Sequence, residues 1–361
     1  NPSHLYGSPG TYNVILTVAT NNGCVDSATL AIVIFPVPVA AFSTTDVCQY
    51  DTAQFSDGST ISSGSVNSFQ WDFDDASNSV SQNPSHNFSS EGTYNVELMV
   101  TSNNGCSDSI TQPIIIFPVP QADFSFNNEC LYDAVQFNDN TTISGGNFSW
   151  NWDFGDGGTS SVANPSHQYS ADGTYNVVLI VISNNNCSDT IMKQDTIYPV
   201  PVADFSFTDT CVADTARFFD LSTIAGGTIA GWNWNFGDAN TSVAQNPFHL
   251  YASAGSYPVT LIVSSGFNCT DTITQTIVQF PMPTANFDAD SVCFNNTTFF
   301  TDLSNGNGDA IDSWTWIFGD TALLSYLQNP SHLYSAAGDY NVTLIVETTN
   351  GCKDYEMFSI P

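Results

Sequence analysis

One short phrase recurs five times along the chain, and its spacing restricts the architecture more than any other feature. The copies begin at residues 1, 83, 164, 246 and 329 and read NPSHLYGSPGTY, NPSHNFSSEGTY, NPSHQYSADGTY, NPFHLYASAGSY and NPSHLYSAAGDY. Successive copies are 82, 81, 82 and 83 residues apart. This period is longer than a solenoid unit of roughly 20–50 residues and close to the ~100 residues of a small sandwich domain. Each unit can bury its own core, so the spacing predicts a tandem array of separate domains.

Proline-rich segments mark the boundaries between these units. Each places two prolines one residue apart, directly after an apolar run: FPVPVAAF (35–42), FPVPQADF (117–124), YPVPVADF (198–205) and FPMPTANF (280–287). Proline fixes φ and removes a donor, so we expect short, stiff, extended joints. The predicted repeats are 36–117, 118–198, 199–280 and 281–361. Residues 1–35 match only the second half of a repeat, and we expect them to be the C-terminal part of a truncated one in a longer array.

The hydrophobic pattern inside each unit has a period of two. Tyr94, Val96, Leu98 and Val100 alternate with other residues, and the same alternation recurs in the tryptophan-containing stretch SWNWDFGDG. Turn signals such as GDGG, NPS, ADG and NNN separate these runs, and no window of useful length shows helical spacing. The pattern therefore predicts an all-β chain, with about seven short strands per repeat arranged as a sandwich and the sandwiches joined end to end as a rod.

The nine cysteines follow the same period. After Cys24 they fall in pairs 58, 57, 58 and 59 residues apart, one pair in each complete repeat. The simplest interpretation is one disulfide per repeat, with Cys24 bonded to a cysteine upstream of residue 1; the predicted pairs are Cys48–Cys106, Cys130–Cys187, Cys211–Cys269 and Cys293–Cys352. Free buried thiols are the alternative, and zinc is disfavoured because no CxxC or close Cys/His spacing occurs. Disulfides in every repeat indicate an oxidising, extracellular location at the cell surface.

The charge balance excludes several partner classes. The chain has 3 basic and 35 acidic residues, a net charge of −32. Nucleic acids and anionic membrane surfaces are both bound through Lys and Arg, so neither is expected as a partner. No run of 18 apolar residues occurs, so the sequence predicts no membrane insertion in this segment.

The combination of motifs resembles a known family. WDFGDG (152–157), NPSHQY (164–169) and GTYNVVLIVISNNNC (173–187) together are similar to the PKD domain, an immunoglobulin-like β-sandwich. The cysteine pair, the PVPxADF segment and the NNGCxD hairpin resemble PKD repeats of very large secreted surface proteins of the Bacteroidetes group. The resemblance covers the whole chain, although WDFGDG becomes WDFDDA (71–76), WNFGDA (234–239) and WIFGDT (316–321) in the other repeats.

The histidine of the recurring phrase has two interpretations. It could be a metal ligand or pH-sensitive group, or a partly buried residue that ties a loop to a carbonyl. No second His or Cys lies near it in sequence, which favours the tie. The Gly-x-Tyr that follows resembles a tyrosine corner, in which the hydroxyl pins the loop to the sandwich. The residues concerned are His86, His167, His249 and His332, with Tyr94, Tyr175, Tyr257 and Tyr340.

The acidic turn after the tryptophan strand is the better ligand candidate. Asp72, Asp75, Asp153 and Asp156 could supply some of the six to eight oxygens that calcium takes. The equivalent of Asp153 is not acidic in the last two repeats, so one recurrent carboxylate per repeat is too few for a site. A turn role is favoured, no cofactor is expected, and calcium between repeats remains the open alternative.

A recurrent Asp-Ser/Thr-apolar triplet resembles the O-glycosylation signal of Bacteroidetes secreted proteins. The alternative is that strands beginning with Asp-Thr-Ile are ordinary and the repeat copies them. The candidate hydroxyls are Ser27, Thr52, Ser109, Thr190, Thr196, Thr215, Thr272, Ser291 and Thr321.

No motif supports catalysis, and two function classes remain. GxSxG, HExxH and Gly-rich phosphate loops are absent, so we do not expect an enzyme. The preferred function is a structural spacer or stalk in a long cell-surface adhesin or filament. Its partners would be neighbouring repeats, like chains in a fibre, or surface glycans. The alternative is an accessory array of a secreted hydrolase that stacks exposed aromatics on polysaccharide. Burial discriminates between them, because Trp152, Trp234 and Trp316 should be inside a spacer's cores.

Overall fold

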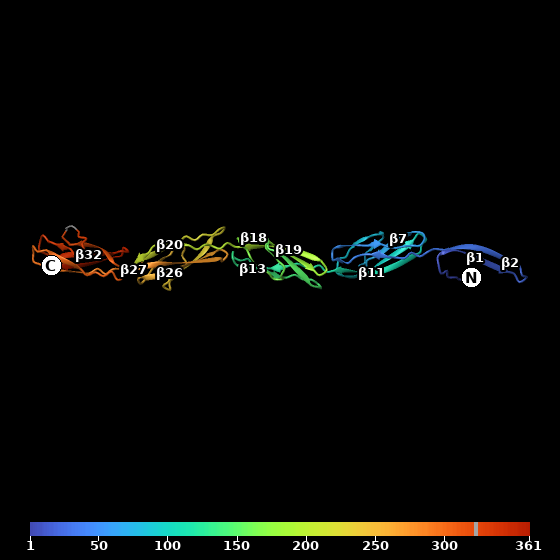
Figure 1. Ribbon diagram of the computed structural model, residues 1–361, viewed down its shortest axis with the longest axis horizontal. Helices are drawn as coiled ribbons and strands as arrows, with labels where there is room; N and C mark the ends of the chain where they lie inside the picture. The colour runs from blue at the N-terminus through green and yellow to red at the C-terminus, as the bar shows by residue number, and fades with distance from the viewer. Residues whose placement is uncertain (321–323) are drawn as a thin grey trace. The chain divides into compact units, whose positions relative to one another are not determined.

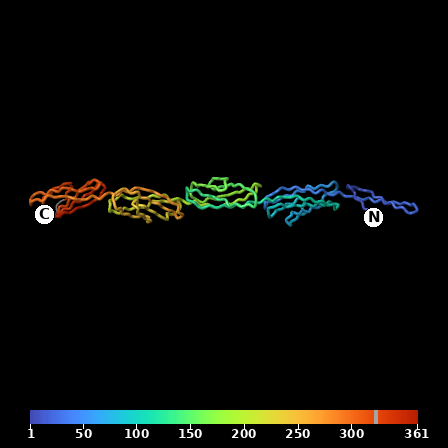
Figure 2. Tube along the Cα trace, turned by 90° about the horizontal axis from the view of Figure 1, so that it is seen from below, coloured from blue at the N-terminus to red at the C-terminus, as the bar shows by residue number. Residues whose placement is uncertain are grey.

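The computed structural model describes residues 1–320 and 324–361, and its regular structure there consists of strands only. Figure 1 shows the chain as strand arrows without a helix, and in Figure 2 the chain doubles back several times within each repeat. Among the described residues, no helix is long and apolar enough to cross a membrane. The predicted all-β fold is thus confirmed.

Residues 1–35 form a single antiparallel hairpin. Its strands are β1 (Gly10–Ala19) and β2 (Val25–Ile34). The apolar side chains Val14, Leu16 and Val18 are 39%, 64% and 55% exposed, whereas the equivalent residues of the next repeat are fully buried. The difference shows what the second sheet of a complete repeat contributes, because the hairpin alone leaves its apolar face in water.

Repeat 36–117 is a two-layer sandwich. One layer has the strand order β4-β11-β10-β7-β8, and the other contains the pairs β3-β6 and β5-β9. The long hairpin β10–β11 is antiparallel, whereas the short β4 pairs with the end of β11 in parallel. The strands are β3 (Phe42–Ser43), β4 (Val47–Cys48), β5 (Thr52–Gln54), β6 (Ser56–Asp57), β7 (Val66–Asp72), β8 (Asn78–Ser79), β9 (Ser85–Asn87), β10 (Gly92–Ser102) and β11 (Ser107–Phe117).

Repeat 118–198 has the same arrangement, with the sheet β16-β15-β18-β19 facing the pairs β12-β14 and β13-β17. The strands are β12 (Phe124–Ser125), β13 (Ala134–Gln136), β14 (Asn138–Asp139), β15 (Phe148–Asp153), β16 (Thr159–Ser160), β17 (Ser166–Gln168), β18 (Gly173–Ser183) and β19 (Ser188–Ile197).

Repeats 199–280 and 281–361 repeat the two layers. Their larger sheets have the orders β21-β27-β26-β23-β24 and β30-β32-β33, and the opposite layers are β20-β22-β25 and β28-β29-β31. The strands are β20 (Phe205–Phe207), β21 (Thr210–Cys211), β22 (Thr215–Asp220), β23 (Ile229–Asn235), β24 (Thr241–Ser242), β25 (Phe248–Leu250), β26 (Gly255–Ser265), β27 (Thr270–Phe280), β28 (Phe287–Ala289), β29 (Thr298–Asp302), β30 (Ile311–Ile317), β31 (Ser331–His332), β32 (Tyr340–Thr348) and β33 (Lys353–Ile360).

Every complete repeat has its own core around one tryptophan. Trp71, Trp152, Trp234 and Trp316 are fully buried, as the alternation predicts for the last three. The core of repeat 36–117 packs Trp71 with Phe42, Phe55 and the Val96/Leu98/Val100 face of β10. Burying one such aromatic residue stabilises a domain by about 3–5 kcal/mol relative to alanine. Each tryptophan Nε1 also donates to a backbone carbonyl ten or eleven residues on, so its polar atom is satisfied.

The proline-rich segments are anchored to the repeat that follows them. Val39 exchanges two backbone hydrogen bonds with Thr60, and Val202 does the same with Thr223. Two residues before each of these partners, the chain turns at Asp57 or at its equivalents, whose carboxylates cap the next backbone amides. The segments therefore begin the next domain and are not loose tethers.

Candidate functional site

The cysteines join consecutive repeats, which corrects the pairing predicted from sequence. The disulfides are Cys48–Cys187, Cys130–Cys269 and Cys211–Cys352, with sequence separations of 139, 139 and 141 residues. The predicted pairs Cys48–Cys106, Cys130–Cys187, Cys211–Cys269 and Cys293–Cys352 do not form. Among the described residues Cys24, Cys106 and Cys293 are unbonded, and the prediction that Cys24 bonds upstream stays a prediction.

Strand length explains why pairing within a repeat fails. Cys48 lies opposite Phe117, the last residue of β11, whereas Cys106 immediately precedes the first residue of that strand. Eleven residues at the strand rise put the two cysteines roughly 35 Å apart along β11. A disulfide needs Cα atoms within about 7 Å. The early and late cysteines of one repeat therefore lie at opposite ends of its sandwich.

The early cysteine is held at the end where the chain leaves for the next repeat. The amide that follows it donates to the carbonyl of the residue just before the linker, as from Gln49 to Phe117 and from Val212 to Phe280. A turn follows, closed by the Asp51 amide on the Cys48 carbonyl, with Tyr50 at φ 71°. Cys293 has the equivalent turn, with Asn295 at φ 71°.

The late cysteine closes a tight turn at the tip of the long hairpin. In repeat 199–280 the Ser265 amide donates to the Cys269 carbonyl, and Asn268 lies at φ 65°. Asn or Gly stands before the late cysteine because these residues tolerate the left-handed region best. The hairpin tip thus presents its cysteine to the preceding repeat. At the joint of repeats 118–198 and 199–280, the Tyr198 ring also stacks on Phe267 of this tip at 3.9 Å.

The histidine of the recurring phrase bonds the acidic turn. Its Nε2 lies 2.7–2.8 Å from a carboxylate Oδ2 in every complete repeat, and its ring stacks on the phenylalanine that precedes this turn. The tie predicted from sequence is therefore present, but its acceptor is a carboxylate and not a backbone carbonyl. The pairs are His86–Asp75, His167–Asp156, His249–Asp238 and His332–Asp320.

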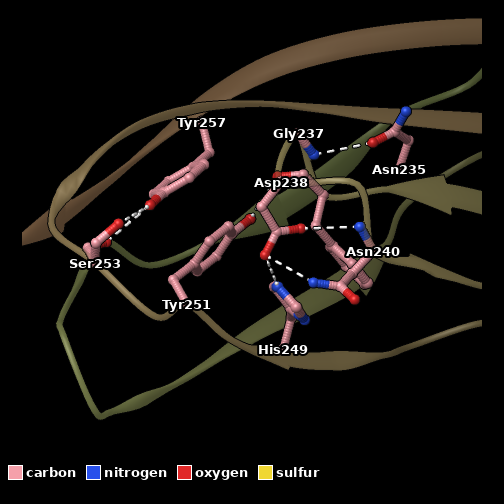
Figure 3. A network of polar contacts seen from close by, with 9 residues as sticks. Asn235, Gly237, Asp238, Asn240, His249, Tyr251, Ser253 and Tyr257 are labelled. Carbon is pink, nitrogen blue, oxygen red and sulfur yellow. Dashed lines mark hydrogen bonds and ion pairs between the residues drawn. The ribbon is translucent and has the colours of Figure 1, made fainter.

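Hydrogen bonds set the protonation of the acidic turn. Burial alone would raise the pKa of Asp238, but donors from His249 and Asn240 outweigh it and hold this pKa below its usual value (Figure 3). The pKa of Asp75 and that of Asp156 are lowered for the same reason. Burial first, and then the Asp238 charge, raises the pKa of Tyr251, whose hydroxyl donates to the Phe236 carbonyl at 3.0 Å.

The tyrosine that ends the phrase forms the predicted corner. Tyr257 donates to the Ser253 carbonyl at 2.9 Å, four residues upstream, and Tyr94 and Tyr340 do the same at 3.1 and 2.8 Å (Figure 3). The phrase is therefore a fastening: its histidine ties the acidic turn, and its tyrosine ties its own loop.

The calcium candidates are engaged within their turns. Asp153 accepts from the Gly155 amide, and Asp156 accepts from the Gly158 amide and from His167. Asp72 and Asp75 cap the equivalent amides in repeat 36–117. In the described part of the chain, no group of three His, Cys, Asp or Glu residues could hold a metal ion. The turn role favoured from sequence accounts for these carboxylates.

One cluster contains a serine, a histidine and an aspartate, but it cannot act as a catalytic triad. Ser77 Oγ lies 3.2 Å from His86 Nε2, and Asp75 Oδ2 lies 2.7 Å from the same nitrogen. A relay needs the serine on one ring nitrogen and the carboxylate on the other. Ser77 also bonds Asp75 directly, and Asn240 takes its place in repeat 199–280.

The glycosylation candidates lie on the surface, and several of their aspartates have structural roles. The hydroxyl residues are exposed except for Thr196, which is half-buried, and Thr321, which lies outside the described residues. Asp108, Asp189 and Asp271 accept from the amides of Ala40, Ala122 and Ala203 at the end of the preceding linker. The fastening of the linker explains these triplets without a glycan; the glycans themselves stay a prediction.

Comparison with known proteins supplies the family. A family model described as "PKD domain" matches residues 35–116, 118–199, 198–279 and 281–359. The chain belongs to the PKD-domain family. The tandem PKD array predicted from sequence is confirmed, whereas its assignment to the Bacteroidetes stays a prediction.

Individual relatives match parts of this PKD array. The pre-pro-metalloprotease PrtV of Vibrio cholerae is 29% identical over 159 residues, 43% of this chain and 17% of that protein. Collagenase ColA of Bacillus cereus is 34% identical over 74 residues, 20% of this chain and 8% of that protein. The crystal structure of the PKD1 domain from V. cholerae PrtV is 36% identical and covers 23% of this chain and 99% of that domain, with a TM-score of 0.21. The matches span only 8–17% of the curated relatives' lengths.

Proposed function

We propose that this PKD array is a non-catalytic extracellular spacer, a stalk segment of a cell-surface adhesin or filament. The observation that supports it best is the disulfide between each pair of consecutive complete repeats. A joint that is closed by a disulfide beside the peptide linker has less freedom than a linker alone. Disulfides persist in oxidising compartments, which supports the extracellular location.

The buried tryptophans also favour a spacer. The four core tryptophans are sealed inside, and the other three are half-buried, with Nε1 bonded to Asp139, Asp220 or Asp302. The described surface therefore offers no exposed tryptophan as a stacking platform for sugar rings.

The second candidate is an accessory array of a secreted hydrolase, and the similarity to a metalloprotease and a collagenase favours it. Such an array would bind a substrate of its enzyme, whereas a spacer need not. In both functions the array supplies no catalytic residue, and neighbouring repeats are its first partners. Glycans, like chains and calcium are partners that either function would admit.

The test compares reach with binding. Small-angle scattering of the oxidised 361-residue chain should give a maximum dimension that falls by a constant amount when repeat 281–361 is removed. Co-sedimentation with fibrillar collagen and with insoluble polysaccharide should leave the chain in the supernatant. A dimension unchanged by removal of the repeat would contradict the spacer, and saturable binding to either material would favour the accessory array.

A further inference from the structure

We infer that the staggered disulfides make the array a covalently length-limited tether, whose reach under tension depends little on whether its repeats are folded. This inference rests on the proposed spacer function, and it adds a mechanical property that neither the fold nor the family supplies. It depends on covalent connectivity alone.

The shortest covalent route through the array skips most of the chain. A force that reaches Cys48 crosses its disulfide to Cys187, follows the peptide to Cys211 and crosses again to Cys352. Residues 49–186 and 212–351 lie in closed loops beside this route. These loops contain most of every complete repeat, so unfolding them adds nothing to the distance between the ends.

The remaining load-bearing segment is short. From Cys187 to Cys211 there are 24 residue steps, which span at most roughly 79–86 Å when fully extended. The two disulfides add Cα–Cα distances of 5.6 and 5.7 Å. Without disulfides the 304 steps from Cys48 to Cys352 could reach roughly 1,000–1,090 Å. The covalent route thus limits the span to about a tenth of that length.

The load-bearing segment has little length to give. It consists of β19, the linker 198–205 with its two prolines, and β20. A strand already rises about 3.3 Å per residue, close to the extended limit. Tension on this segment therefore meets chain that is already drawn out.

The third disulfide provides an internal control. Cys130–Cys269 overlaps both loops, but it does not lie on the shortest route. Its removal leaves the 24-step route intact. Removal of Cys48–Cys187 forces the route from Cys48 along the peptide to Cys130, across to Cys269 and back to Cys211, which takes 140 steps.

The experiment is single-molecule stretching of the oxidised 361-residue chain, held at its termini without reductant. The contour at full extension should be about 260–290 Å plus two disulfides, because 80 residue steps lie on the route. The double variant Cys130→Ser/Cys269→Ser should give the same contour. The double variant Cys48→Ser/Cys187→Ser should give about 650–700 Å, from 196 steps.

The outcomes separate the alternatives. A wild-type contour of about 420–460 Å would correspond to pairing within repeats and would overturn the inference. Equal contours for the two variants would overturn it as well. Contour depends on connectivity and not on folding, so a variant that folds poorly still reports its route once peptide mapping has verified its remaining disulfides. Failure here leaves the spacer intact if the scattering result holds, and a substrate-binding array would still show the predicted contours.

Discussion

At the residue scale, the recurring histidine shows how far sequence reasoning reaches. The lack of nearby His or Cys in sequence favoured a structural tie, and each complete repeat has one. The acceptor was missed because the acidic turn lies 11 or 12 residues earlier, and only the sandwich brings the two loops together. Both motifs recur in every complete repeat at a nearly fixed offset, and that shared spacing was the available signal. Trp152 was predictable because alternation alone decides its face.

The Asp238 pair predicts a pH dependence on the acid side. The pKa of Asp238 is lower in the folded state than the unfolded value near 3.9, so its stabilisation is complete above about pH 4 and is lost as pH falls through the folded pKa. Hydrogen exchange of peptides from residues 236–250 should therefore speed up below pH 4. In Asp238→Asn exchange should already be faster at pH 7, by the equivalent of about 1–3 kcal/mol, and should change less with acid.

The matched control is Asp214→Asn, an exposed aspartate of the same repeat. It removes the same charge without touching the turn, so both the rate at pH 7 and the acid dependence should match the parent chain. Identical acid profiles for Asp238→Asn and the parent would show that the pair contributes nothing.

At the scale of elements, the strands were predictable and their ends were not. Alternation placed the long hairpin strand through Tyr94, and the Asn and Gly residues placed its turn. The short strands β4 and β21 were not recognised, because two residues show no period. Yet these strands hold the early cysteines beside Phe117 and Phe280, and so they decide which cysteines can meet.

The bond from Asp271 to the linker is testable at this scale. Asp271 Oδ2 accepts from the Ala203 amide at 2.8 Å. Asp271→Ala should expose that amide, accelerate its hydrogen exchange in peptides covering residues 198–205, and destabilise repeat 199–280 by about 1–3 kcal/mol. The neighbouring change Thr272→Ala removes an exposed hydroxyl and should alter neither readout. Unchanged exchange at Ala203 in Asp271→Ala would contradict the role given to this carboxylate.

At the scale of the whole molecule, periodicity predicted the repeats but could not fix the disulfide register. Pairing within a repeat and pairing with the next repeat give equally regular spacings, because each shifts both cysteines by the same period. The choice depends on where each cysteine lies on the sandwich, which a single-sequence pattern does not show. In the chain-entropy model each 139- or 141-residue loop contributes about 5 kcal/mol, against about 4 kcal/mol for the shorter loops expected from sequence. Overlapping loops do not add independently.

The most direct test of the account is peptide mapping of the intact, non-reduced chain by mass spectrometry, with thiols blocked before digestion. The account predicts linked peptides that join Cys48 to Cys187, Cys130 to Cys269 and Cys211 to Cys352. Linked peptides that join Cys48 to Cys106, or Cys211 to Cys269, would contradict it.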